Sequence, residues 1–79
     1  MNEISIEEIL QLVELQFGEL GVQPADRLAE DLSAESADVI NLVASAEEKY
    51  GVVLKESEIA RIFTPEDLFL LIQRKLNGS

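Results

Sequence analysis

Apolar residues recur at three- and four-residue steps in three stretches of this chain, and this spacing limits the fold more than any other feature. On a helix such residues share one face, which has to be buried against another element. The stretches cover residues 6–20, residues 36–50 and a segment that begins at Pro65 and ends before Gly78. In the first stretch the predicted buried face consists of Ile6, Ile9, Leu10, Val13, Phe17 and Leu20, widened by Leu12 and Leu15.

Residues that favour helix ends bound each of these stretches. Ser5 and Glu8 have the spacing of a capping box, in which Ser5 accepts from the backbone of Glu8 and Glu8 reaches back to Ser5. Gly21 and Gly51 are expected to end the first two helices in the left-handed conformation. Thr64, followed by proline and two acids, is expected to begin the last helix.

The connecting segments complete the predicted architecture. Residues 22–34 are expected to form a loop that Leu28 and Leu32 anchor to the helices. Residues 52–54 are apolar, but no partner strand exists elsewhere, so they are interpreted as a connector. Residues 57–62 are expected to form a short third helix. With 79 residues the chain has room for one small domain. We therefore predict an all-α bundle of three main helices and one short helix in a single domain, residues 1–79.

Composition excludes several classes of function. Sixteen acidic residues against six basic ones give a net charge of −10, which disfavours nucleic acid and anionic membranes and favours basic protein surfaces. The absence of cysteine and histidine removes the thiolate metal site and the commonest general base. The chain is therefore not expected to be an enzyme or to hold a metal. It shows no signal peptide and no stretch long enough to span a membrane, so we expect a cytoplasmic protein.

Ser36 lies at the predicted start of the second helix, and the carboxylates of Glu35 and Asp38 flank it. Serine is among the preferred N-cap residues, and capping alone would explain its position. The first backbone N–H groups of a helix lack helical partners, however, so this place also suits a phosphate ester. Both roles are consistent with the residues.

Residues 31–37, Asp-Leu-Ser-Ala-Glu-Ser-Ala, resemble the attachment motif D-L-G-x-D-S-L of the acyl carrier proteins. The resemblance covers essentially the whole chain, since residues 20–22, 39–43, 46–52 and 63–68 also follow the family pattern in order. The motif departs at three positions: Ser33 replaces the usual glycine, Glu35 the usual aspartate and Ala37 the usual leucine. Ser33 can replace glycine unless the backbone needs a positive φ there.

The resemblance implies that Ser36 carries a covalent 4′-phosphopantetheine arm, whose thiol holds acyl groups as thioesters. It implies a phosphopantetheinyl transferase as a partner. It also implies acyl-transferring or acyl-processing enzymes with basic docking surfaces, in fatty-acid, polyketide or related specialised biosynthesis. Val39 and Leu42 are expected to belong to the core. The residues expected to recognise partners are Glu35, Ala37, Asp38, Ile40, Glu47 and Glu48.

Two alternatives remain open at this point. An aminoacyl or peptidyl carrier would use the same arm, although the strong negative charge favours acyl cargo. An unmodified, acidic interaction module with a carrier-like fold is suggested by the altered motif at Ser33, Glu35 and Ala37. A monomer is the simplest expectation for a shuttle.

Overall fold

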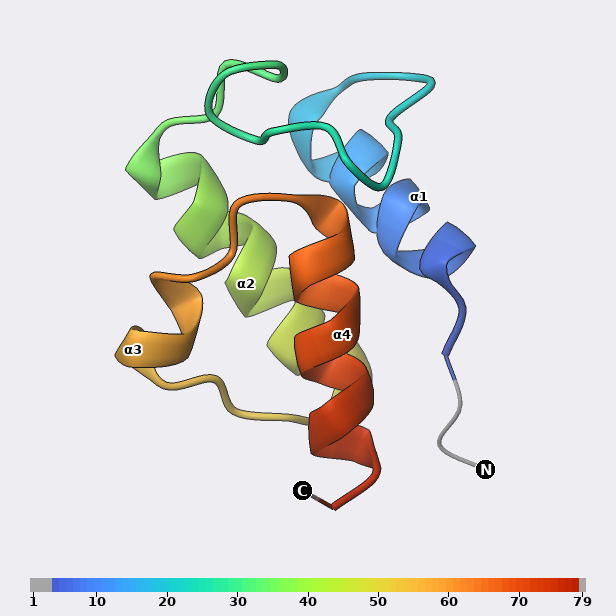
Figure 1. Ribbon diagram of the computed structural model, residues 1–79, viewed down its shortest axis with the longest axis vertical. Coiled ribbons are helices and arrows are strands. Elements are labelled where there is room, and N and C mark those ends of the chain that lie inside the picture. Colours follow the sequence, from blue (N-terminus) through green and yellow to red (C-terminus); the bar gives the residue numbers. More distant parts are fainter. Residues whose placement is uncertain (1–3, 79) are drawn as a thin grey trace.

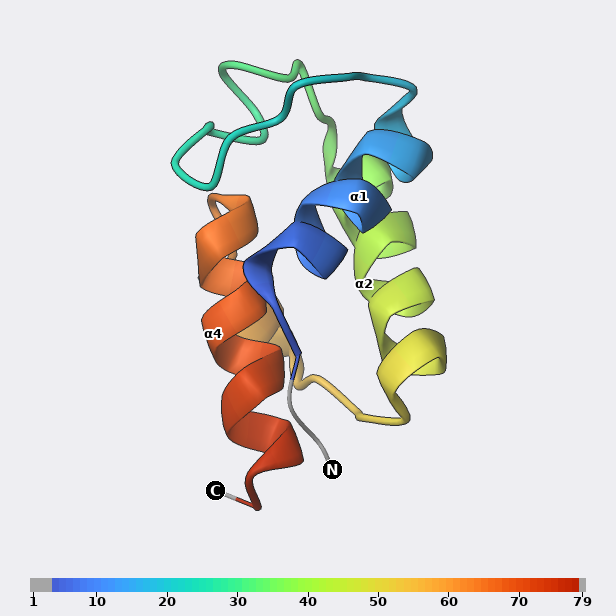
Figure 2. The same cartoon turned by 90° about the vertical axis from the view of Figure 1, so that its right-hand side faces the viewer.

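The computed structural model describes residues 4–78 and contains four α-helices in that range (Figure 1). They are α1 (Ile6–Phe17), α2 (Ser36–Tyr50), α3 (Glu56–Ile59) and α4 (Pro65–Leu76). Helices α2 and α4 run in the same direction, and α1 crosses against them and packs on both (Figures 1 and 2). Residues 4–78 contain no strand. The predicted all-α bundle of three main helices and one short helix is confirmed.

One hydrophobic core joins the helices, the long loop and the connectors. Its helical members lie on the predicted faces, and residues of the loop and the connectors complete it. Removal of these side chains from water is the main source of stability for so short a chain. The buried core residues are Ile9, Val13, Val22, Leu28, Leu42, Val43, Ala46, Leu54, Ile62, Leu68, Leu71 and Ile72.

Only the Ser5 half of the predicted capping box forms at the start of α1, and the Glu8 half is replaced by a contact with the end of α2. The Ser5 hydroxyl accepts a hydrogen bond from the Glu8 N–H, with an N···O distance of 3.4 Å. The structure directs the Glu8 carboxylate to another element: its Oε1 accepts from the Tyr50 hydroxyl at 3.1 Å. Glu8 therefore links two helices by a contact across 42 positions of sequence.

Tyr50 is the only tyrosine, so the absorbance of its phenolate reports one group. Burial, and then the hydrogen bond and the negative charge of Glu8, raise the pKa of Tyr50 to about 12. The fold thus favours the neutral phenol. The stabilisation that comes from keeping Tyr50 protonated is complete below the unfolded pKa of about 10. It is lost as the pH rises through the folded pKa of about 12. We expect a spectroscopic midpoint near 12, which Glu8→Gln lowers without returning it fully to 10. A wild-type midpoint at 10 would contradict the Tyr50–Glu8 contact.

The predicted end of α1 is wrong. The helix ends at Phe17 and not at Leu20, because Gly18 takes the left-handed conformation, with φ +67°, and donates its N–H to the Glu14 carbonyl. The chain then turns, and the Glu14 carboxylate accepts from the N–H groups of Gly21 and Val22 at 2.8 and 3.0 Å. As a result the Leu20 side chain is 93% exposed. Of the predicted apolar face, Leu20 and Leu15 are both in solvent.

The other helix ends follow their local signals closely. Gly51 caps α2 with φ +67°. The Thr64 hydroxyl accepts from the Asp67 N–H at 3.1 Å, and Pro65 is the first residue of α4, as predicted. The short helix α3 begins one residue earlier than expected and ends at Ile59, three residues before the predicted end. In the connector before it, Leu54 is buried, whereas Val53 is exposed.

The loop between α1 and α2 is fastened to the start of α4, above the ends of the helices (Figure 2). Leu28 is buried as predicted, and its N–H donates to the Phe63 carbonyl at 2.9 Å. The Glu66 N–H donates to the Pro24 carbonyl at 3.1 Å. Within the loop, the backbone N–H and guanidinium of Arg27 bind Asp31, and these contacts lower the pKa of that carboxyl. The loop therefore delivers the chain to the start of α2 in a defined path.

Candidate functional site

Ser36 is the first residue of α2 and is exposed to solvent. Of the two roles that the sequence left open, capping does not apply, because the N-cap is Glu35. Within residues 4–78 the Ser36 hydroxyl has no side-chain hydrogen bond. Its N–H and that of Ala37 belong to the first turn, where no carbonyl lies four residues back in the helix. An uncommitted hydroxyl thus lies beside two outward-facing backbone donors and the positive end of a 15-residue helix.

Asp38 stabilises this helix start. Its Oδ2 accepts a hydrogen bond from the Glu35 N–H at 2.8 Å, so the side chain of the third helical residue caps the N-cap backbone. The Asp38 side chain is half-buried, whereas Glu35 is exposed. Because Asp38 supplies the cap, the neighbouring Ser36 hydroxyl is not needed for helix formation.

Ser33, three residues before Ser36, adopts a left-handed backbone with φ +57°. Apart from glycines it is the only residue with positive φ in the described part of the chain. The conformation lets the next residue, Ala34, donate its N–H to the Leu28 carbonyl at 2.8 Å. Leu28 is held in the core, so the turn at Ser33 fixes how the chain enters α2.

The six residues expected to recognise partners divide into two groups. Ala37, Ile40, Glu35 and Glu48 are exposed, and Ile40 leaves 59% of its side chain in solvent. Glu47 is half-buried, and its Oε2 accepts from the Leu54 N–H at 2.7 Å, which holds the connector against α2.

Asp38 is likewise occupied at the helix start. The carboxylates of Asp38 and Glu47 therefore have structural contacts, and those of Glu35 and Glu48 face outward. In the middle of α2, Leu42 is fully buried and Val39 packs partly buried against the core, as expected.

Comparison with known proteins identifies the family. A scan against protein-family models finds no match. The anthracycline acyl carrier protein DauA of a Streptomyces species is 32% identical, over 100% of this chain and 99% of that protein. The acyl carrier protein of Thermotoga maritima is 33% identical, over 91% of this chain and 96% of that protein. That of Helicobacter hepaticus is 38% identical over 66% of this chain and 68% of that protein. The chain belongs to the acyl carrier protein family.

These relatives are named as carriers and not as enzymes. In residues 4–78 of this acyl carrier protein family member, no helix is long and apolar enough to cross a membrane. The same residues place no group of three or more acidic side chains close enough to hold a metal ion.

The positive φ at Ser33 explains why glycine suits this position of the acyl carrier protein motif. A side chain in the left-handed region costs about 1–2 kcal/mol, and glycine avoids that cost but loses more freedom on folding. We expect Ser33→Gly to raise the free energy of unfolding by about 0.5–1 kcal/mol. Thermal unfolding followed by circular dichroism measures the change.

A matched control lies on the exposed side of α2. Ala44→Gly introduces the same residue into a helix interior and should destabilise the protein by about 1 kcal/mol. Equal losses in the two variants would show that Ser33 is not strained.

Sequence reasoning missed several exposed side chains. Phe63 and Val53 are large apolar residues in solvent, and they lie in connectors whose exposure no periodicity reveals. Arg61 and Arg74 line a groove between α3 and α4. Arg74 has a local explanation as a cation in the last turn of α4, which hides its nearness to α3.

Proposed function

We propose that this chain is an acyl carrier protein that bears a 4′-phosphopantetheine arm on Ser36. The observation that carries the proposal is the exposed Ser36 hydroxyl at the start of α2, which has no side-chain hydrogen bond within the described residues. The full-length similarity to named acyl carrier proteins supports it. When bound, the arm would supply a thiol that holds acyl groups as thioesters.

The residues around Ser36 fit such a group. Ser36 and its neighbours Glu35 and Ala37 are all exposed, and the N–H groups of the first turn favour a negatively charged phosphodiester. The Asp38 carboxylate is held at the helix start by its hydrogen bond from the Glu35 N–H. The chain has no histidine or cysteine, so the base that activates the Ser36 hydroxyl would belong to the transferase.

The docking surface that we propose for partner enzymes combines weak charge contacts with a small apolar centre. Glu35 and Glu48 present outward carboxylates, and Ala37 and Ile40 provide exposed apolar surface on the same helix. Arginine and lysine on the partner would speed encounter without holding the complex tightly, as a shuttle requires. Asp38 and Glu47 would act by shaping this surface.

The cargo that we propose is an acyl intermediate of fatty-acid, polyketide or related specialised biosynthesis. The relatives include two that are named as anthracycline acyl carrier proteins and others that are named only as acyl carrier proteins, which supports acyl cargo in general. The negative charge suits basic enzyme surfaces in either. We propose that the protein acts as a monomer in the cytoplasm, since a shuttle has to expose the whole surface around Ser36 to successive partners.

Intact mass tests the attachment. The purified chain is incubated with coenzyme A and a broad-specificity phosphopantetheinyl transferase, and the expected result is a gain of one phosphopantetheine. Fragmentation of the tryptic peptide that contains residues 28–49 then assigns the modified serine. No gain from a chain with intact helical circular dichroism would overturn the proposal and leave the unmodified interaction module as the better reading.

A further inference from the structure

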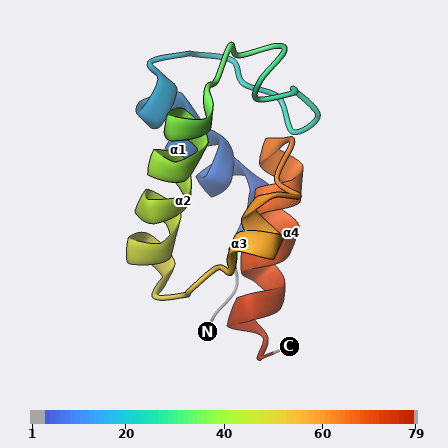
Figure 3. The same cartoon turned by 90° about the vertical axis from the view of Figure 1, so that its left-hand side faces the viewer.

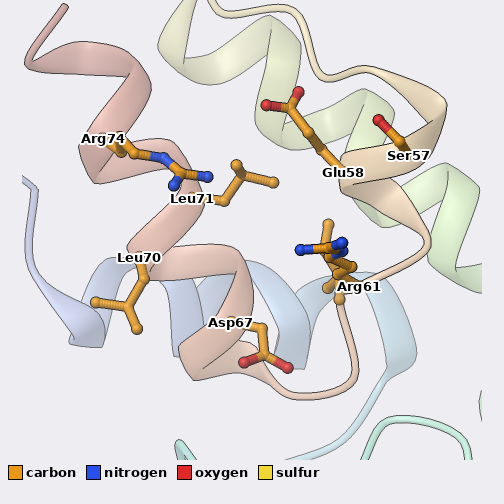
Figure 4. Close-up of a pocket in the computed structure, with 8 residues that line it drawn as sticks. Ser57, Glu58, Arg61, Asp67, Leu70, Leu71 and Arg74 are labelled. Atoms are coloured by element: carbon orange, nitrogen blue, oxygen red, sulfur yellow. The ribbon is translucent and has the colours of Figure 1, made fainter. Parts of the chain in front are cut away.

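A groove of about 600 Å³ lies between α3 and α4 (Figure 4). Its apolar part consists of Ile62 and Leu71, which are nearly buried, and Leu70, which is 53% exposed. The volume falls within the range of pockets that hold small organic molecules, roughly 300–1,000 Å³. An acyl chain that lies on this floor would bury one side against these three residues.

The two carboxylates at the border of the groove are already engaged. Glu58 accepts from the Lys55 N–H at 2.8 Å and binds the Lys75 ammonium at 3.0 Å, and these contacts lower the pKa of Glu58. Asp67 accepts from the N–H groups of Phe63 and Thr64. In Figure 4 the carboxylates of Glu58 and Asp67 lie at opposite margins of the groove.

The guanidinium groups of Arg61 and Arg74, by contrast, have no carboxylate partner within residues 4–78. Figure 4 shows both guanidinium groups directed into the space between α3 and α4. Neither forms a salt bridge within residues 4–78, whereas Arg27 binds both Glu30 and Asp31. In a chain of net charge −10, two arginines without carboxylate partners on one groove create a local preference for an anion.

The groove opens on the face formed by α3 and α4, with α2 behind them, so a group attached at Ser36 would reach it around the outside of α3 (Figure 4). Figure 1 places the first turn of α2 and helix α3 on the same, left-hand side, and Figure 3 shows both from that side. A cargo tethered at Ser36 would be confined near the protein, which raises its effective concentration at the groove. Even a weak site would therefore be occupied by tethered cargo and not by the same molecule free in solution.

We infer that the α3–α4 groove binds the tethered cargo of this carrier when that cargo ends in a carboxylate, with the chain on Ile62, Leu70 and Leu71 and the anion between Arg61 and Arg74. The inference rests on the proposed function, because the arm on Ser36 delivers the cargo. It assigns a substrate class: acyl groups with a negatively charged far end.

The test compares two cargoes of equal length on the full chain with its arm attached. Octanedioyl and octanoyl thioesters are loaded, and NMR records the methyl shifts of Leu70 and Leu71 and the Hε shifts of the arginines. We expect the octanedioyl form to shift these signals relative to the unloaded protein, and the octanoyl form to leave the arginine signals unchanged. In the double variant Arg61→Gln/Arg74→Gln, the octanedioyl-dependent shifts of the Leu70 and Leu71 methyls should fall by at least about twofold, because the charge-assisted hydrogen bonds to the anion are lost.

The matched control is Arg27→Gln/Lys49→Gln, which changes the net charge equally at exposed positions away from the groove. It should retain the full shifts. Equal shifts from the two cargoes, or unchanged shifts in the arginine variant, would overturn the inference. Equal shifts from free octanedioate at the protein's own concentration would overturn the role of the tether. A failure of the proposed function is distinguished by intact mass, which shows that the arm is missing before any cargo is loaded. A missing arm would overturn the inference as well.

Discussion

Ser36→Ala is expected to abolish the phosphopantetheine mass gain completely. The substitution removes the only hydroxyl at the start of α2, and its fold cost is small because Glu35 and Asp38, not Ser36, form the cap. Alanine at the first helical position also has a high helix propensity. The variant should therefore keep the wild-type circular dichroism and unfolding midpoint while its mass stays at the unmodified value in the same transferase reaction.

Two other serines supply the controls for this result. Ser33 lies outside the helix in the left-handed turn, and the Ser45 hydroxyl lies mid-helix, where it donates to Gln16 Oε1 at 2.9 Å. Ser33→Ala and Ser45→Ala should both still gain one arm. A full mass gain in Ser36→Ala would assign the attachment to another residue and refute the proposed site. Loss of the gain in Ser33→Ala alone would show that the turn, and not only the hydroxyl, is read by the transferase.

Leu28→Ala is expected to lower the free energy of unfolding by about 3 kcal/mol, the largest stability change proposed for this chain. The Leu28 side chain is 1% exposed and belongs to the core, so truncation leaves a cavity as well as losing buried apolar area. The Leu28 backbone is bonded on both sides, to the Phe63 carbonyl and from the Ala34 N–H, which limits how far the loop can collapse into the space. Small domains have roughly 5–15 kcal/mol in total, so the loss should be visible in urea unfolding as a lower midpoint.

Leu20→Ala is the matched control, since it makes the same chemical change in the same loop. Leu20 is 93% exposed, and its truncation should change the stability by no more than about 0.5 kcal/mol. Similar losses in the two variants would mean that Leu28 does not anchor the loop. A large loss in Leu20→Ala would restore the longer α1 that the sequence pattern predicts.

Helix starts were predictable because their signals act over a few residues. Ser5 and Thr64 accept from the N–H three residues on, and Pro65 fits the first helical position, so each start is a local event. The end of α1 was not predictable in this way. Both Gly18 and Gly21 have positive φ, and either could end a helix. The helix ends at Gly18, and the Glu14 carboxylate accepts from the N–H groups of Gly21 and Val22 in the turn that follows.

In the candidate site, too, some features follow from local sequence and others depend on contacts between distant residues. The place of Ser36 at the start of α2 followed from the sequence, and so did the exposure of Ala37 and Ile40. The need for positive φ at Ser33 did not, because it depends on where Leu28 is held in the core. The attachment of Glu47 to the connector was equally hidden, since a carboxylate that faces water and one that binds a distant N–H look alike in sequence.

By itself, then, the sequence determined the all-α class, the starts of the helices and the position of Ser36, because capping and apolar periodicity are properties of neighbouring residues. Only the tertiary structure decided which leucines are buried, which carboxylates remain free and that Arg61 and Arg74 share one groove. These features depend on which surfaces of different helices meet. The contacts between helix surfaces are set by the packing of the whole core, which no local pattern encodes.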